Sequence, residues 1–115
     1  TMIIVGGGPI GLEMAVQGVK AGLEVTVLER GASTAANVRE WGHVELFSAY
    51  SLNMSEAGIQ VLKEAGAAMP DTGVFPSGAA YSQDYLDVLA GWLAGKDSCR
   101  IVLNAEVVAM GRGAM

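Results

Sequence analysis

A short apolar run followed at once by a glycine-rich turn constrains this chain more than any other feature. Residues 2–5 read Met-Ile-Ile-Val, and residues 6–11 read Gly-Gly-Gly-Pro-Ile-Gly. The apolar run is typical of a strand buried on both faces, as in a parallel sheet. Residues 10–21 then carry apolar side chains at helical spacing, and residues 23–28 predict a second strand that ends at Glu29. The pattern predicts a right-handed βαβ unit at the start of an α/β fold.

The remainder of the chain predicts two further helices and two short strands. The expected elements are a helix from Ser55 as N-cap to Gly66, a loop over 69–78, a helix over 79–94 closed by Gly95, and strands over 100–103 and 106–110. Gly22, Gly66 and Gly95 each follow an alanine, and we expect all three to take the left-handed conformation at a helix C-terminus. Residues 31–50 have no clean period and predict a long loop, which is usually functional in a compact domain.

The amino-acid composition limits which kinds of partner this chain can be expected to bind. The 115 residues carry 12 acidic and 7 basic side chains, so the formal net charge is −5, which does not favour binding to nucleic acid or an anionic membrane. One cysteine, Cys99, and one histidine, His43, make neither a disulfide nor a metal-ligand set, so we expect no metal. No signal peptide or membrane span is expected, and a cytoplasmic location is predicted. Because apolar runs lie close to both ends, we expect residues 1–115 to be one domain from a longer protein.

The spacing in the glycine-rich turn has a chemical meaning. G-x-G-x-x-G between a strand and a helix, with an acid about 20 residues further on, is the fingerprint of dinucleotide binding. Gly6 would permit the tight turn, Gly8 would let a diphosphate approach the backbone, and Gly11 would let the helix pack closely on the strand. Pro9 suits the helix start because its missing N–H costs nothing there. The free N–H groups near Ile10 and the positive end of the helix dipole would then receive the diphosphate.

Glu29 supplies the acid of the fingerprint. Its carboxylate would accept hydrogen bonds from the ribose hydroxyls of an adenosine, and it would repel a 2′-phosphate, which disfavours NADP at this position. The neighbouring Arg30 is a candidate adenosine contact, although a solvated charge is the simpler interpretation. A glycine-rich turn can also exist without a ligand, and Glu29 can be an ordinary acid at a strand end.

These residues resemble a known family. The segments Ile3–Glu13 and Gly22–Arg30 resemble the N-terminal FAD-binding fingerprint of flavoprotein oxidoreductases with two dinucleotide-binding domains, which include flavin-containing monooxygenases and pyridine nucleotide-disulfide oxidoreductases. The same fingerprint occurs in the internal NAD domain of disulfide reductases, so FAD and NAD both remain open at this point. The resemblance implies a Rossmann-type βαβ parallel sheet that forms an incomplete FAD-binding domain.

Later segments resemble the monooxygenase-like members of that group. These segments are residues 37–48 (NVREWGHVELFS), the Pro76-Ser77-Gly78 helix start, and residues 101–112. Here Ala49-Tyr50 replaces the proline and tryptophan that relatives carry, and the second glycine-rich motif and the C-terminal Gly-Asp segment are not present. The resemblance places Trp41, with His43 and Phe47, in a loop near the cofactor, while a simple covering of the sheet is an equal alternative.

The resemblance implies a function for the whole protein and a limited role for these residues. FAD is the expected cofactor and NAD(P)H the expected co-substrate, with the remainder of the oxidoreductase as the partner of this segment. The cofactor-binding residues would be Gly6, Gly8, Pro9, Ile10, Gly11, Glu29, Arg30 and Trp41. No catalytic residue is assigned, because the flavin carries the chemistry, and the isolated chain is expected to be inactive. The alternatives are an NAD-binding domain of a disulfide reductase or dehydrogenase and a non-catalytic nucleotide-binding module.

Overall fold

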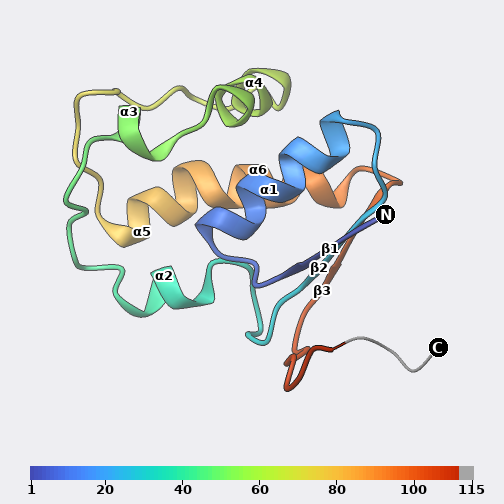
Figure 1. The fold of residues 1–115 in the computed structure, drawn as a ribbon. Helices are drawn as coiled ribbons and strands as arrows, with labels where there is room; N and C mark the ends of the chain where they lie inside the picture. The colour runs from blue at the N-terminus through green and yellow to red at the C-terminus, as the bar shows by residue number, and fades with distance from the viewer. Residues whose placement is uncertain (112–115) are drawn as a thin grey trace.

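A three-stranded parallel sheet forms the base of the molecule. The computed structural model describes residues 1–111, and its strands are β1 (Met2–Val5), β2 (Val25–Leu28) and β3 (Cys99–Val102), paired in the order β1-β2-β3 (Figure 1). The register pairs Ile4 with Val27 and Val27 with Ile101. A parallel sheet with helical crossovers is the α/β, Rossmann-type arrangement that the sequence predicts.

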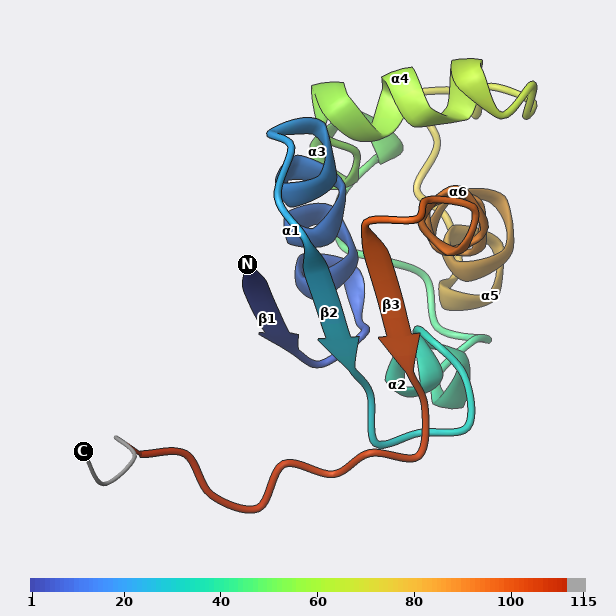
Figure 2. The same cartoon turned by 90° about the vertical axis from the view of Figure 1, so that its right-hand side faces the viewer.

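The helices gather on one face of this sheet. They are α1 (Pro9–Lys20), α2 (Ala36–Glu40), α3 (Tyr50–Asn53), α4 (Glu56–Glu64), α5 (Gly78–Tyr81), the π-helical turn η1 (Ser82–Leu86) and α6 (Asp87–Ala94). Helix α1 packs on β1 and β2, α6 packs on β3, and α4 lies across α1 and α6 as a further layer (Figure 2). The core lies between sheet and helices, where Leu12, Val27 and Leu89 are fully buried.

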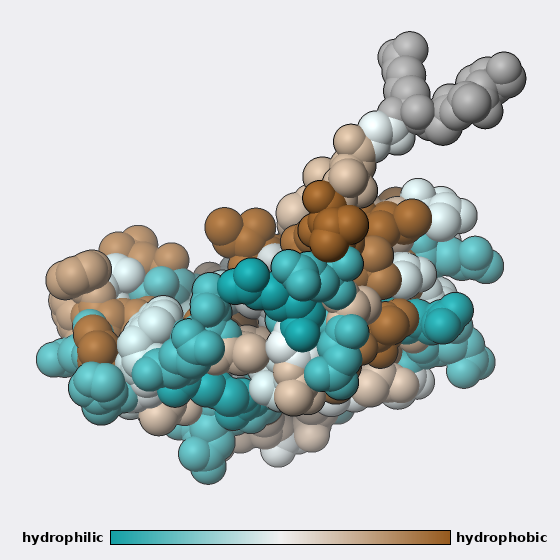
Figure 3. All heavy atoms as spheres, turned by 90° about the horizontal axis from the view of Figure 1, so that it is seen from below, coloured by the Kyte–Doolittle hydropathy of each residue, from teal (hydrophilic) through white to brown (hydrophobic). Residues whose placement is uncertain are grey.

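The opposite face of the sheet carries no helix among the described residues. Ile4 is 5% exposed, but its neighbours Ile3 and Val5 are 67% and 51% exposed. Side chains alternate along a strand, so only the set that includes Ile4 meets the helices. The expectation of a strand buried on both faces is therefore wrong for β1. Seen from below, the molecule shows apolar side chains gathered at the base of the projecting C-terminal segment (Figure 3).

The helix ends follow the capping rules in two cases of three. Gly22 and Gly66 have φ of 81° and 68°, as expected after α1 and α4. Gly95 has φ of −82°, so the prediction of a left-handed residue there is wrong. Its N–H bonds back to the carbonyls of Gly91 and Trp92, so the last turn closes with a right-handed backbone. Ser55 caps α4 as predicted, because its side chain accepts a hydrogen bond from Gly58 N at 2.8 Å.

Three other local predictions need correction. The helix expected over 79–94 is a continuous helical segment whose middle, η1, is π-helical. The loop expected over 31–50 contains α2 and the start of α3. Residues 106–110 form no strand, because no described strand lies alongside them to complete a hydrogen-bond ladder. Arg112, the last residue of the segment that resembles the monooxygenase-like group, lies outside the described residues. Within residues 1–111 no helix has the length and apolar character needed to cross a membrane.

Candidate functional site

The glycine turn, residues 6–11, connects β1 to α1 in the way its spacing predicts. Gly6 has φ of 99°, a conformation that residues with a side chain rarely adopt. A Cβ on Gly11 would lie 3.0 Å from the carbonyl carbon of Gly6 and closer still to its oxygen, so only glycine lets α1 begin this near the strand. Gly6 thus shapes the turn, and Gly11 permits the close approach of helix and strand.

The N-terminus of α1 is open to an anionic ligand. No side chain caps it, its first turn carries no acidic residue, and Pro9 occupies the first position. Gly8, the N-cap, has φ of −85°, and a Cβ built on it meets no atom within 4 Å. Free N–H groups and the positive end of a 12-residue helix therefore face unfilled space at Gly8.

Glu29 holds the loops together at the end of β2. Glu29 as a whole residue is only 9% exposed. Oε1 accepts a hydrogen bond from Gly7 N at 2.8 Å, and Oε2 accepts one from Gly31 N at 2.6 Å. A carboxylate has about four acceptor positions, so two remain for a ligand. Glu29 therefore ties the glycine turn to the loop after β2 while keeping acceptor capacity free.

Three loops meet at the carboxyl ends of the strands. Ala35 N donates to Gly7 O at 2.8 Å, Asn104 N to Gly31 O at 3.0 Å and Ala105 N to Glu29 O at 2.9 Å. A partly open cavity of about 500 Å³, the glycine-turn cavity, lies where these loops meet. It is lined by Val5, Gly6, Gly8, Leu28, Glu29, Arg30, Gly31, Ala36, Asn37, Glu40, Ala105, Glu106 and Val107. In open parallel sheets, ligands bind outside the carboxyl ends of the strands, where this cavity lies.

The structure brings most of the predicted cofactor residues to this turn. Gly6, Gly8, Glu29 and Arg30 line the glycine-turn cavity. A second, more open hollow of about 400 Å³ lies on the other side of the turn, and its lining includes Gly6, Gly8, Pro9, Ile10 and Gly11. The two hollows share the backbone of Gly6 and Gly8, so the predicted residues form one continuous surface around the turn.

Trp41 lies apart from that surface. It is the C-cap of α2 and lines neither hollow. Its ring lies against Gly78, where a Cβ would come within 2.8 Å of Trp41 Cε3. Phe47, further along the same loop, is fully exposed, and His43 is also exposed. In the described part of the chain, Phe47 and His43 therefore lie in solvent, and Trp41 packs beside Gly78.

Sequence reasoning missed several residues that line the cavity. Asn37 and Glu40 come from α2, which the sequence did not predict, and Ala105–Val107 lie in the segment expected to be mainly strand. The available signal was topological: segments that follow parallel strands meet at the same edge of the sheet, so residues after β3 belong beside Glu29.

The charges in the cavity favour an unphosphorylated ribose. Glu29, Glu40 and Glu106 line it, and among the described residues Arg30 is the only basic side chain in its lining. A diphosphate there must rely on the backbone N–H groups of α1, while a 2′-phosphate beside Glu29 would meet net negative charge.

A second polar cluster ties α1 to the helices above it. Glu13 accepts hydrogen bonds from the hydroxyl groups of Ser55 and Tyr85. Burial and the bonded Glu13 raise the pKa of Tyr85 well above its usual value, so this hydroxyl stays protonated. Burial also raises the pKa of the Cys99 thiol, which agrees with a small packed side chain and not with a reactive one.

Comparison with known proteins agrees with this geometry. The sequence profile of the family described as pyridine nucleotide-disulphide oxidoreductase matches residues 3–107. No curated protein gives a significant match.

Solved structures share the fold at low sequence identity. THI4 of Thermovibrio ammonificans has a TM-score of 0.51 and 20% identity, over 89% of this chain and 37% of that one. The Diels-Alderase PyrE3 of the pyrroindomycin biosynthetic pathway has a TM-score of 0.56 and 18% identity, over 97% of this chain and 27% of that one. The p-nitrophenol 4-monooxygenase PnpA from Pseudomonas putida DLL-E4 has a TM-score of 0.52 and 22% identity, over 97% and 33%. This chain thus spans 27–37% of the length of these structures.

Proposed function

This chain belongs to the pyridine nucleotide-disulphide oxidoreductase family, and on that premise we propose that it binds the ADP half of FAD. In this proposal it is the N-terminal segment of a longer, flavin-dependent, monooxygenase-like oxidoreductase. The observation that carries the proposal is the glycine-turn cavity of about 500 Å³, in which Gly6, Gly8 and Glu29 meet at the carboxyl ends of the strands.

The residues present fit the two polar parts of ADP. The diphosphate would lie against Gly8, where a Cβ would meet no atom within 4 Å, and would accept hydrogen bonds from the first N–H groups of α1. The ribose hydroxyls would donate to the two acceptor positions that Gly7 and Gly31 leave free on Glu29. Arg30, which is exposed and lines the cavity, would contact the adenosine.

The chain itself would bind and orient, and the flavin would supply the redox chemistry when bound. Among the residues described, none is assigned a catalytic role. In the complete protein NAD(P)H would act as co-substrate, and Trp41 would lie toward the flavin half of the cofactor, outside the ADP site. The isolated 115-residue chain is accordingly expected not to oxidise NAD(P)H.

Flavin retention tests the proposal directly. The purified chain is incubated with FAD, freed of excess, and examined for visible flavin absorption and for the identity of the released flavin. We expect FAD to be retained, FMN not to be retained because it lacks the adenosine, and ADP to compete with FAD.

A matched pair of variants locates the binding. Gly8→Ala adds a methyl group where the diphosphate would approach, and Gly91→Ala adds one at an exposed position of α6; neither Cβ meets an atom of the described residues within 4 Å. We expect only Gly8→Ala to lose FAD and ADP. Retention of NAD in place of FAD would favour the NAD-domain alternative, and failure to bind FAD, NAD or ADP would refute the proposal.

A further inference from the structure

A buried phenol away from the dinucleotide site lacks a hydrogen-bond partner. Tyr50, in α3, is 4% exposed, and its hydroxyl oxygen bonds to no group within residues 1–111. Buried polar groups are nearly always paired, and each exception calls for an explanation. The neighbouring Tyr81 does not share this feature, because its hydroxyl donates to Asn53 O at 3.1 Å.

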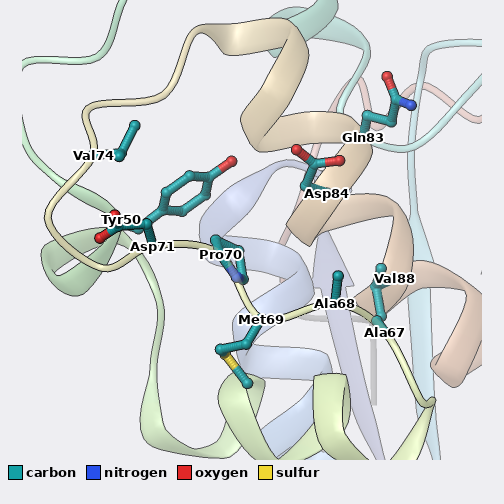
Figure 4. A pocket seen from close by; sticks show the side chains of 10 residues that line it. All are labelled: Tyr50, Ala67, Ala68, Met69, Pro70, Asp71, Val74, Gln83, Asp84 and Val88. Carbon is teal, nitrogen blue, oxygen red and sulfur yellow. The ribbon is translucent and has the colours of Figure 1, made fainter.

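The phenol lines a cavity of about 390 Å³, here named the Tyr50 cavity. The cavity lies between α3, the segment 67–74, and the helical stretch formed by η1 and the start of α6. Figure 4 shows the Tyr50 hydroxyl pointing across this space toward the carboxylate of Asp84. The walls beside it are apolar, with Met69, Pro70 and Val88 among them.

The charged groups of this cavity are acceptors, and the side-chain amide of Gln83, which both donates and accepts, is also in its lining. Two carboxylates line it, Asp84 and Asp71, and Asp71 already accepts a hydrogen bond from Gly73 N at 3.0 Å. Within residues 1–111, no Lys, Arg or His belongs to its lining. Burial and the nearby Asp84 raise the pKa of Tyr50, so its side chain stays a neutral hydroxyl that can accept as well as donate. A complementary ligand therefore brings N–H donors, positive charge and a small apolar body.

We propose that the Tyr50 cavity binds a small organic cation, a primary amine on a compact apolar group. Its ammonium donates hydrogen bonds to Tyr50 Oη and to the Asp84 carboxylate, and its apolar part lies against Met69 and Pro70. An anion would meet two carboxylates with no counter-charge, and a purely apolar molecule would leave the Tyr50 hydroxyl unpaired. Among the described residues, none lines both this cavity and the glycine-turn cavity, so this inference stands apart from the proposed function.

Titration with three probes of one shape tests the charge preference. Benzylamine, benzyl alcohol and benzoate are titrated separately into the isotopically labelled chain, and backbone amide shifts are followed by NMR. We expect benzylamine binding to reach saturation with a Kd of about 1 mM, an affinity that is reasonable for so small a molecule. The shifted amides are expected to be those that line the Tyr50 cavity. Benzyl alcohol is expected to bind several-fold more weakly, and benzoate not to bind.

Three substitutions assign the contacts. Asp84→Asn is expected to weaken the binding of benzylamine about fivefold, as for a half-exposed ion pair. Tyr50→Phe is expected to weaken it about threefold. Asp97→Asn removes the same charge at an exposed turn outside the cavity and is expected to leave the affinity unchanged. Equal binding of the three probes, shifts that map elsewhere, no saturation, or equal effects of Asp84→Asn and Asp97→Asn would each overturn the proposal.

Discussion

Replacing Gly11 by alanine separates the structural glycine of the turn from the glycine that faces the ligand. The added Cβ would lie 3.0 Å from the carbonyl carbon of Gly6, nearer still to its oxygen, and 3.3 Å from Ile4 Cγ2. The obstacle is backbone that is itself fixed by the hydrogen bond from Gly6 N to Leu28 O, so it cannot yield as a flexible side chain would. Helix α1 must therefore move away from β1.

The magnitude follows from two opposing effects. Overpacking of this kind costs about 3 kcal/mol when the neighbours cannot rearrange. Alanine in a helix regains about 1 kcal/mol relative to glycine. The free energy of unfolding should thus fall by about 2 kcal/mol, which for a chain of this size lowers Tm by about 10 °C.

Denaturation followed by circular dichroism measures this effect, with Gly8→Ala as the partner variant. Gly8 has φ of −85°, and its Cβ would meet no atom within 4 Å, so Gly8→Ala should unfold close to the parent while losing ADP. The reasoning fails if Gly11→Ala unfolds within about 0.5 kcal/mol of the parent, which is the usual range for surface changes, or if Gly8→Ala proves equally unstable.

Four further predictions concern single side chains. Glu29→Gln turns an amide N–H₂ toward one of the N–H donors of Gly7 and Gly31, so the free energy of unfolding from urea denaturation should fall by about 2 kcal/mol. The same change at exposed Glu45 should leave that free energy unchanged. Tyr50→Phe removes an unpaired buried hydroxyl and should raise the free energy of unfolding by about 1 kcal/mol in the same assay; a loss would contradict the lack of a partner. Ser55→Ala removes the N-cap of α4 and should cost about 1 kcal/mol, seen as a lower Tm. Burial raises the pKa of Tyr81 from 10.0 to about 12, so its stabilising effect is complete below pH 10.0 and disappears as the pH rises toward about 12; denaturation midpoints across that range should fall, and fall less in Tyr81→Phe.

Much of the turn and its strands could be predicted from short segments. Apolar residues 2–5 form β1, Gly6 takes the positive φ that the turn needs, and Gly11 permits the close contact with the strand. Ser55 caps α4 in the same local way. These features depend on residues a few positions apart, where steric limits and hydrogen bonding within one turn decide the conformation.

The remaining predictions failed where a partner distant in sequence decides the outcome. Residues 106–110 have the pattern of a strand but no described strand beside them, and β1 is apolar throughout but covered on one face. The π-helical turn η1 brings Tyr85 to Glu13, a contact between residues 72 positions apart. Helical spacing alone does not encode such a register change.

The sequence by itself therefore determined the βαβ start and the glycine turn, because local backbone preferences decide both. It also shows directly that an acid follows β2. Only the tertiary structure decided that both oxygens of Glu29 bind backbone N–H groups of two loops, and that Ala105–Val107 close the cavity beside it. It also decided that the buried hydroxyl of Tyr50 points toward Asp84. Tertiary packing decides these contacts. Which segments the core brings together determines whether a distant polar group is paired, shared or left free.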